Sequence, residues 1–262
     1  MPVAVRYYTD PACAVSFGNE PVLRKLMVEF GAQLRFTYVM GGLARTYEGA
    51  HDARVREWLD VSARSGMPID PRLWLEGPIH STYPACMAVK AAAEQSADGG
   101  YGYLRAIREG LLCFRRKLDS TEALVDVARE VGLDAARFRI DLESNAIVEA
   151  FGADLEATRE REELVLPSAS FQGDDGRAHW VLGPARYEDW RAAAVAAGAA
   201  PAGDARPSVE AALARFGRMS AAEVGAVCDL PGPRAAAELW RLTADWRARA
   251  VGVLAGWLFE PA

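Results

Sequence analysis

A strand-helix-strand pattern opens the chain, and a long stretch without any strand pattern follows it. This order constrains the fold more than any other feature. Val3–Thr9 is rich in β-branched and aromatic residues and ends at an Asp-Pro pair, so it predicts a strand closed by a turn. Apolar residues recur mostly at three- and four-residue steps over Ala14–Phe30, which predicts a helix with one buried face that ends at Gly31. Gln33–Val39 alternates apolar and polar residues with the period of a strand.

Between about Arg54 and Glu162 the pattern changes to helices separated by Gly or Pro. Strand patterns return at Leu164–Phe171 and Ala178–Leu182, joined by a turn-rich segment suited to a hairpin, and a helix over Tyr187–Ala197 follows. The chain therefore predicts β-α-β, a helical insertion and then β-β-α. The helices expected within the insertion include Tyr83–Gln95, Tyr103–Phe114, Thr121–Val131 and Ala146–Arg161.

The segment Gly198–Pro207 is rich in Ala, Pro and Gly, which is typical of a connection between folded units. We therefore expect a main domain over residues 1–200, with a helical insertion at about 44–160, and a small, mostly helical domain over residues 207–262. Ser220 and Glu223 have the spacing of a capping box. The smaller domain is expected to contain helices over Ser208–Phe216, Ser220–Leu230 and Arg234–Arg247, and then a short strand or hairpin over Ala250–Phe259.

Composition and charge exclude several classes of protein. Hydrophobic residues make up 51% of the chain and charged residues 25%, as in ordinary globular proteins. The formal net charge of -6 disfavours binding to nucleic acid, because such proteins carry basic surfaces. The start of the chain lacks the features of a secretory signal, and the longest apolar stretch is about half of the roughly 20 residues that cross a bilayer. We expect a cytoplasmic protein without nucleic-acid or membrane partners.

The cysteines at positions 13, 86, 113 and 228 are widely separated. This spacing fits neither a disulfide framework nor a zinc site, so we expect free thiols and no metal. Cys113 and Cys228 follow apolar residues and are expected to be buried in the core. Cys13 falls between the first strand and the first helix, where unpaired backbone N–H groups stabilise a thiolate. The alternative reading of Cys13 is a small apolar residue at the start of a helix.

The string from Thr9 to Gly18, Thr-Asp-Pro-Ala-Cys-Ala-Val-Ser-Phe-Gly, resembles the active-site segment of DsbA-like oxidoreductases. In that family Asp-Pro-x-Cys-x-x-Cys stands at the head of the first helix. The segments Met40–Leu43, Ser81–Lys90 and Tyr103–Glu109 are similar to insertion segments of the cytoplasmic, FrnE-like branch. The resemblance covers about residues 3–198 and implies an α/β thioredoxin-like fold with thiol-disulfide chemistry at Cys13. The C-terminal segment resembles a small winged-helix-like arrangement.

The chain departs from the family at Ser16, which occupies the position of the second cysteine. A single cysteine that attacks a disulfide is left in a mixed disulfide until another thiol releases it. Glutathione or another small thiol would supply that thiol as a co-substrate, or Cys86 would if the insertion folds over the active site. The Ser16 hydroxyl would donate a hydrogen bond to the Cys13 thiolate, or would only satisfy a donor at the helix start. No tightly bound cofactor is expected.

Pro167, at the start of the third strand, matches the cis-proline that faces the active-site cysteine in thioredoxin-fold proteins. The resemblance implies that the Leu166 backbone pairs with a bound peptide or with glutathione. It also places Pro11, Phe17 and Ser168 among the substrate contacts. The alternative is an ordinary loop proline at the edge of a strand.

Three functions remain open at this point. The leading hypothesis is a thiol-disulfide oxidoreductase in which Cys13 attacks a protein or small-molecule disulfide and an external thiol completes the cycle. The second is a glutathione-dependent isomerase or transferase of the kappa-like kind. The third is a non-enzymatic adaptor that recognises another protein through its thioredoxin-like surface.

Two groups of aromatic residues bear on binding surfaces. Trp58 and Trp74 in the insertion are interpreted as core residues, with the wall of a groove as the alternative. In residues 207–262 six arginines face six acidic residues, so no net positive charge favours DNA. The aromatic residues of this segment instead favour packing on the main domain or a homodimer; they are Trp240, Trp246, Trp257 and Phe259.

Overall fold

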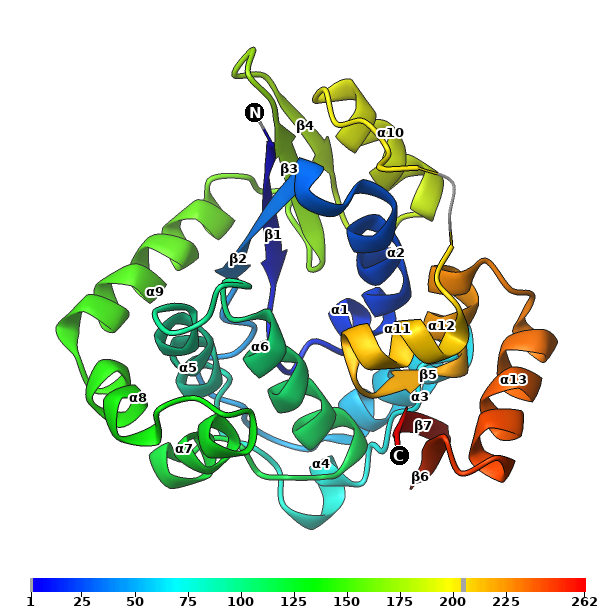
Figure 1. Ribbon diagram of the computed structural model, residues 1–262. Helices are drawn as coiled ribbons and strands as arrows, with labels where there is room; N and C mark the ends of the chain where they lie inside the picture. The colour runs from blue at the N-terminus through cyan, green and yellow to red at the C-terminus, as the bar shows by residue number, and fades with distance from the viewer. Residues whose placement is uncertain (1, 204–205) are drawn as a thin grey trace.

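A computed structural model describes residues 2–203 and 206–262 of the chain (Figure 1). Its main sheet has the strand order β2-β1-β3-β4, built from β1 (Val3–Thr9), β2 (Leu34–Met40), β3 (Ser168–Gln172) and β4 (Ala178–Val181). Strands β1 and β2 are parallel, whereas β3 runs antiparallel to both β1 and β4. This mixed sheet confirms the predicted β-α-β and β-β-α halves of a thioredoxin-like fold.

The first predicted helix is interrupted once. It divides into α1 (Ala14–Gly18) and α2 (Glu20–Phe30), with Asn19 between them and a proline in the first turn of α2. Proline cannot donate the hydrogen bond that a continuous helix needs at this position, so a second helix begins here. As expected, Gly31 ends α2, with a positive φ of 51°.

Residues 44–160 contain helices joined by loops and no strand, and helix α9 packs against strand β2 (Figure 1). The segment expected as one helix over Tyr103–Phe114 contains a helix followed by a single wider π-helical turn. The sequence patterns did not single out Ala135–Leu142, which is also a helix. The elements are α3 (Asp52–Ser65), α4 (Leu73–Glu76), α5 (Tyr83–Ala93), α6 (Tyr101–Arg108), η2 (Glu109–Cys113), α7 (Thr121–Glu130), α8 (Ala135–Leu142) and α9 (Asn145–Arg159).

Helices pack on both faces of the sheet, and neighbouring residues of β1 point to opposite faces. Tyr7 packs against Trp190 of α10 (Tyr187–Ala196), with ring centroids 5.8 Å apart. Tyr8 lies on the other face, where it packs with Ala157 of α9 and with Trp180, whose ring centroid is 5.5 Å away. The end of β1 that leads to Cys13 is therefore held between two packed layers.

Residues 209–261 form a second unit with its own apolar core. Its three-stranded sheet has the order β5-β7-β6 and its helix α12 packs on α2. The three-helix and hairpin arrangement agrees with the winged-helix-like prediction, and the capping box of Ser220 and Glu223 is present. The elements are α11 (Val209–Phe216), β5 (Met219–Ser220), α12 (Ala221–Cys228), α13 (Gly232–Ala244), β6 (Ala248–Val253) and β7 (Gly256–Pro261).

The predicted boundary at Gly198–Pro207 includes Asp204 and Ala205, which lie outside the described residues, so it stays a prediction. Among the helices of residues 2–203 and 206–262, none combines the length and the apolar character that a bilayer crossing requires.

Candidate functional site

The site is built around Cys13, which caps the N-terminus of α1. Strand β1 ends at Thr9, a turn follows, and the Cys13 backbone N–H donates to the Asp10 carbonyl at 3.2 Å. The Cys13 Sγ accepts a hydrogen bond from the backbone N–H of Ser16 at 3.4 Å. The sulfur therefore occupies the position at the helix start that the sequence predicted.

The charge state of Cys13 differs from the prediction. Its side chain is buried, with the residue only 5% exposed, and this burial raises the pKa of the thiol. Hydrogen bonding from Ser16 lowers the pKa by less, and α1 spans only five residues, so its dipole supplies little opposing field. The expectation of a stabilised thiolate is therefore wrong for this conformation, because desolvation of the sulfur outweighs the helix start.

Asp10 is the polar centre of the segment, and the sequence analysis did not identify it. Its carboxylate accepts hydrogen bonds from the backbone N–H groups of Ala12, at 2.8 Å, and Leu43, at 2.7 Å. It also accepts from the Cys86 thiol, at 3.3 Å. Burial nevertheless raises the pKa of Asp10. The carboxylate fixes the turn before Cys13 to the loop after β2 and to α5.

The insertion brings Cys86 against the segment that carries Cys13, as its predicted resolving role required. Cys86 is completely buried, however, and burial next to Asp10 raises its pKa well above the ordinary value. All four cysteines are free and buried, as was expected of Cys113 and Cys228. In the structure, the Cys86 thiol donates a hydrogen bond to the Asp10 carboxylate and helps to hold it in place.

Ser16 is completely buried, and its hydroxyl has no hydrogen-bond partner among the described residues. A buried polar group without a partner is uncommon in folded proteins. The hydroxyl is therefore free to donate to a negative charge that develops nearby. Its predicted hydrogen bond to a Cys13 thiolate stays a prediction.

The peptide bond between Leu166 and Pro167 is cis. Ser168, the next residue, pairs with Tyr8 in the sheet, so Pro167 lies at the same end of the sheet as the turn that leads to Cys13. The Ser168 hydroxyl donates to the Val165 carbonyl at 2.5 Å and accepts from the Gly183 backbone N–H at 3.0 Å. These two hydrogen bonds occupy the hydroxyl, so Ser168 shapes the loop that presents Pro167.

Two predicted substrate contacts have side chains turned inward. Phe17 is completely buried, and the Arg105 guanidinium lies 5.1 Å from the centre of its ring. Pro11 is also buried, whereas Leu166 is half-buried. In this conformation Phe17 faces the core of the main domain, and its predicted contact with a substrate stays a prediction.

A pocket of about 230 Å³ opens beside Cys13, lined by its neighbours Ala12 and Ala14. Three aromatic residues form its wall: the ring centroids of Tyr47 and Trp74 are 5.0 Å apart, and those of Trp58 and Trp74 are 5.3 Å apart. The two tryptophans are buried, as predicted, and also line a hollow, as the alternative held. The Trp74 indole N–H has no partner among the described residues, so it is available to a carbonyl group placed in the pocket.

The rim of this pocket carries both apolar and charged groups. Leu43 is 50% exposed, and Arg54 and Glu57 line the opening. A second hollow of about 330 Å³ includes Val15 of α1 together with Pro184 from the loop after β4. The surface around α1 therefore has two hollows, and the one beside Cys13 is lined by both apolar and charged residues.

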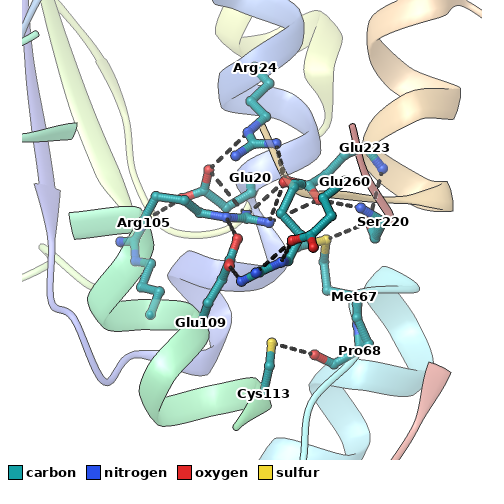
Figure 2. Close-up of polar contacts among 12 residues, drawn as sticks. Glu20, Arg24, Met67, Pro68, Arg105, Glu109, Cys113, Ser220, Glu223 and Glu260 are labelled. Atoms are coloured by element: carbon teal, nitrogen blue, oxygen red, sulfur yellow. Dashed lines mark hydrogen bonds and ion pairs between the residues drawn. The ribbon is translucent and has the colours of Figure 1, made fainter. Parts of the chain in front are cut away.

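A buried cluster of charged residues connects helix α2 with helices α6 and α12 (Figure 2). Glu20, at the start of α2, pairs with Arg108, and Arg108 also donates to the Thr9 hydroxyl at the end of β1. Glu223 of α12 pairs with Arg105, at 2.8 Å, and with Arg24, at 3.1 Å. Burial opposes the charge of Glu20, but the surrounding arginines hold its pKa below the usual value. The cluster joins the main domain to the C-terminal unit.

Residues 7–183 match the protein family described as thioredoxin. The ClpXP adapter protein SpxH of Halalkalibacterium halodurans is 31% identical over 183 residues, which are 66% of this chain and 60% of that protein. The protein of the same name from Shouchella clausii is 26% identical over 264 residues, covering 95% of this chain and 85% of its own length. The solved structure of the cytosolic disulfide reductase DsbM from Pseudomonas aeruginosa has a TM-score of 0.61 and 21% identity, and covers 72% of this chain and 95% of that protein. Its likeness shows the fold.

Proposed function

This chain belongs to the thioredoxin family, and we propose that it is an adaptor that binds a protein partner through the surface around Cys13. The observation that carries the proposal is the state of the sulfur. Cys13 is buried, its pKa is raised, and Ser16 replaces the second cysteine of a redox pair. A nucleophilic cysteine needs the opposite environment, exposed and with a lowered pKa.

The relatives indicate which kind of adaptor to test. Proteins named ClpXP adapter are 31% and 26% identical to this chain, and one of them matches 95% of it. The match covers only 60% of the length of the Halalkalibacterium relative, so the partners of this chain are a proposal. The adaptor would deliver a bound client protein to the ClpXP protease. If the chain performs this role, it would work in the cytoplasm, where thiols stay reduced.

The surface around α1 has the composition of a protein-binding site. Aromatic side chains wall the pocket beside Cys13, the exposed Leu43 lies on its rim, and Arg54 and Glu57 supply charge. Aromatic residues and arginine are enriched where proteins bind one another. The Trp74 indole N–H, which has no partner among the described residues, would donate a hydrogen bond to a backbone carbonyl of the partner.

Degradation assays with purified ClpXP test the proposal. Client proteins would first be found as those whose half-lives lengthen when the gene is deleted, and then be degraded with and without the purified chain. We expect the chain to accelerate their degradation. Cys13→Ser should retain most of this acceleration, because the sulfur performs no chemistry in the adaptor.

A charge-reversing variant tests the surface. Leu43→Asp combined with Glu57→Lys should lower client affinity at least tenfold, because it puts a charge at the apolar Leu43 position and reverses the charge at Glu57. Ile140→Asp combined with Glu149→Lys makes the same changes at exposed positions of α8 and α9, and should leave the affinity unchanged. Loss of the acceleration in Cys13→Ser, or equal effects of the two double variants, would contradict the adaptor.

One observation favours thiol-disulfide exchange as the second candidate. The Ser16 backbone N–H points at the Cys13 sulfur, which is how a helix start receives a thiolate. In this reaction the Cys13 thiolate attacks one sulfur of a disulfide, forms a mixed disulfide, and releases the other sulfur as a thiolate. The glutathione thiolate then attacks the substrate sulfur of the mixed disulfide, which releases the Cys13 thiolate and leaves glutathione in a disulfide with the sulfur that Cys13 had attacked.

Incubation with glutathione disulfide distinguishes the candidates. If exchange is the function, Cys13 becomes glutathionylated within minutes at neutral pH and Ser16→Cys converts the site into a cycling pair. The adaptor predicts that native Cys13 stays unmodified while urea-unfolded chain reacts. Mass spectrometry of the intact chain measures both outcomes.

A further inference from the structure

A further cavity, lined by none of the residues of the proposed adaptor surface, lies between the main domain and the C-terminal unit. It has a volume of about 500 Å³, within the range of small-molecule sites. Helix α2 contributes Arg24, the edge strand β2 contributes Phe36, and helix α6 contributes Tyr101. Helix α11 of the C-terminal unit closes the cavity with Arg215 and Phe216.

The apolar wall of this cavity is aromatic. The rings of Phe36 and Tyr38 are nearly parallel, at 16° with centroids 6.3 Å apart. Tyr38 and Tyr101 continue the series at 21° and 5.8 Å. Phe216 stands on the other side, half-buried. Rings arranged in this way present flat faces on which a planar group stacks.

Positive charge gathers at the same place, although the chain as a whole carries a formal net charge of -6. Arg24, Arg35, Arg105 and Arg215 line the cavity, and Asp98 is the one acidic residue among the described residues that line it. Backbone N–H groups of Gly100, at 3.0 Å, and Gly102, at 2.8 Å, already occupy the Asp98 oxygens. Asp98 is therefore engaged with the start of α6 rather than with the arginines.

Two of these arginines have no acidic partner. Arg35 is exposed and forms no ion pair within the described part of the chain. Arg215 is also exposed; its guanidinium donates to the Met27 carbonyl at 3.0 Å and lies 5.0 Å from the centre of the Phe216 ring. Both charges are free to receive an anion at the mouth of the cavity.

Arg24 supplies an unsatisfied donor at the floor. Its side chain is completely buried, and Figure 2 shows it reaching from α2 toward the buried cluster. Its Nε donates to the Tyr101 hydroxyl at 2.9 Å and its Nη1 pairs with Glu223, whereas its Nη2 has no partner among the described residues. The Phe216 ring lies over this guanidinium, with 5.1 Å between the guanidinium carbon and the ring centre. A buried donor without an acceptor marks a place where a further acceptor is favourable.

We propose that this cavity binds a small organic anion that carries an aromatic ring, with the ring against Phe36 and Phe216 and a phosphate or carboxylate group held by Arg35 and Arg215. The two arginines recognise the anion through charge-assisted hydrogen bonds, and the aromatic wall selects ligands with a planar group. Because the residues come from both units, the bound ligand would also hold the C-terminal unit on the main domain.

Isothermal titration of the full chain tests the proposal with three probes. Phenyl phosphate carries both required features, inorganic phosphate lacks the ring, and benzamide lacks the charge. We expect phenyl phosphate to bind at least tenfold more tightly than either of the others. Equal affinity for inorganic phosphate, or no heat from phenyl phosphate, would overturn the proposal.

A pair of double variants locates the binding. Arg35→Gln combined with Arg215→Gln should weaken phenyl phosphate binding at least tenfold. Arg177→Gln combined with Arg234→Gln removes the same charge at exposed positions outside the cavity, and should leave the affinity unchanged. Circular dichroism of both variants checks that they are folded. Equal losses in the two variants would show that net charge alone attracts the anion, and would overturn the proposed site.

Client degradation is measured in a separate assay, so failure of this anion site would leave the adaptor proposal standing.

Discussion

Cys13 and Glu20 stand at the starts of two adjoining helices, and burial has opposite outcomes at the two positions. Cys13 has one backbone N–H on its sulfur and a raised pKa, so it is a neutral thiol. Glu20 is completely buried but lies among Arg24, Arg105 and Arg108, so its pKa is lowered and it is charged. The difference teaches that burial alone does not decide whether a group in this protein is charged. What decides it is the number of opposite charges that are buried beside the group.

The largest expected effect comes from breaking the charged side of this comparison. Glu20→Gln keeps the size of the side chain but leaves buried arginines without their partner. We expect the free energy of unfolding to fall by about 3–5 kcal/mol, as when one member of a buried ion pair is removed. Urea denaturation of the full chain measures the loss.

The matched control for Glu20→Gln is Glu238→Gln. Glu238 pairs with Arg241 at 3.0 Å on the surface of α13, where that arginine is 55% exposed. We expect a change of about 1 kcal/mol or less, because exposed ion pairs contribute little. Similar losses in the two variants would contradict the importance of burial in the cluster.

The pH dependence of Glu20→Gln should have a definite sign. The folded pKa of Glu20 lies below its ordinary value of about 4.3, so its contribution to stability is present above that pH and lost as the pH falls through the folded pKa. The penalty of Glu20→Gln should therefore shrink in acid. Denaturation at several pH values, compared with wild type, checks this.

Asp10→Asn should show the opposite sign and a smaller effect. Burial raises the pKa of Asp10 above its ordinary value of about 3.9. Its contribution is then fully present below that unfolded value and is lost as the pH rises through the folded pKa. Relative to wild type, Asp10→Asn should gain stability as the pH rises through this window, by no more than about 1.4 kcal/mol per pH unit. A difference that does not change with pH would contradict the raised pKa.

Local patterns in the sequence predicted much of the fold. β1 has the predicted bounds, the strands of the second half form the expected hairpin, and the C-terminal hairpin is present. The position of Cys13 at a helix start was also predictable, because a turn and an amphipathic helix surround it. The break at Asn19 could have been found from the proline that follows it.

The charge states in the site could not be predicted, because they depend on residues far apart in the chain. Arg108 and Glu20 are 88 positions apart, and no sequence pattern around either residue predicts that they form a pair. Cys86 meets Asp10 across 76 positions. The raised pKa of Cys13 follows from how closely the folded chain surrounds the sulfur, which no spacing of residues around it encodes.

The rate at which iodoacetamide alkylates Cys13 tests the central claim most directly. It would be measured by mass spectrometry from about pH 5 to about pH 9, with the urea-unfolded chain as the reference, since an ordinary cysteine ionises at about 8.5. A buried neutral thiol predicts that native Cys13 reacts more slowly than the unfolded thiol at every pH, and that its rate is still rising at the top of the range. Rapid alkylation of the native chain that levels off near about pH 6 would reveal a stabilised thiolate and contradict the account.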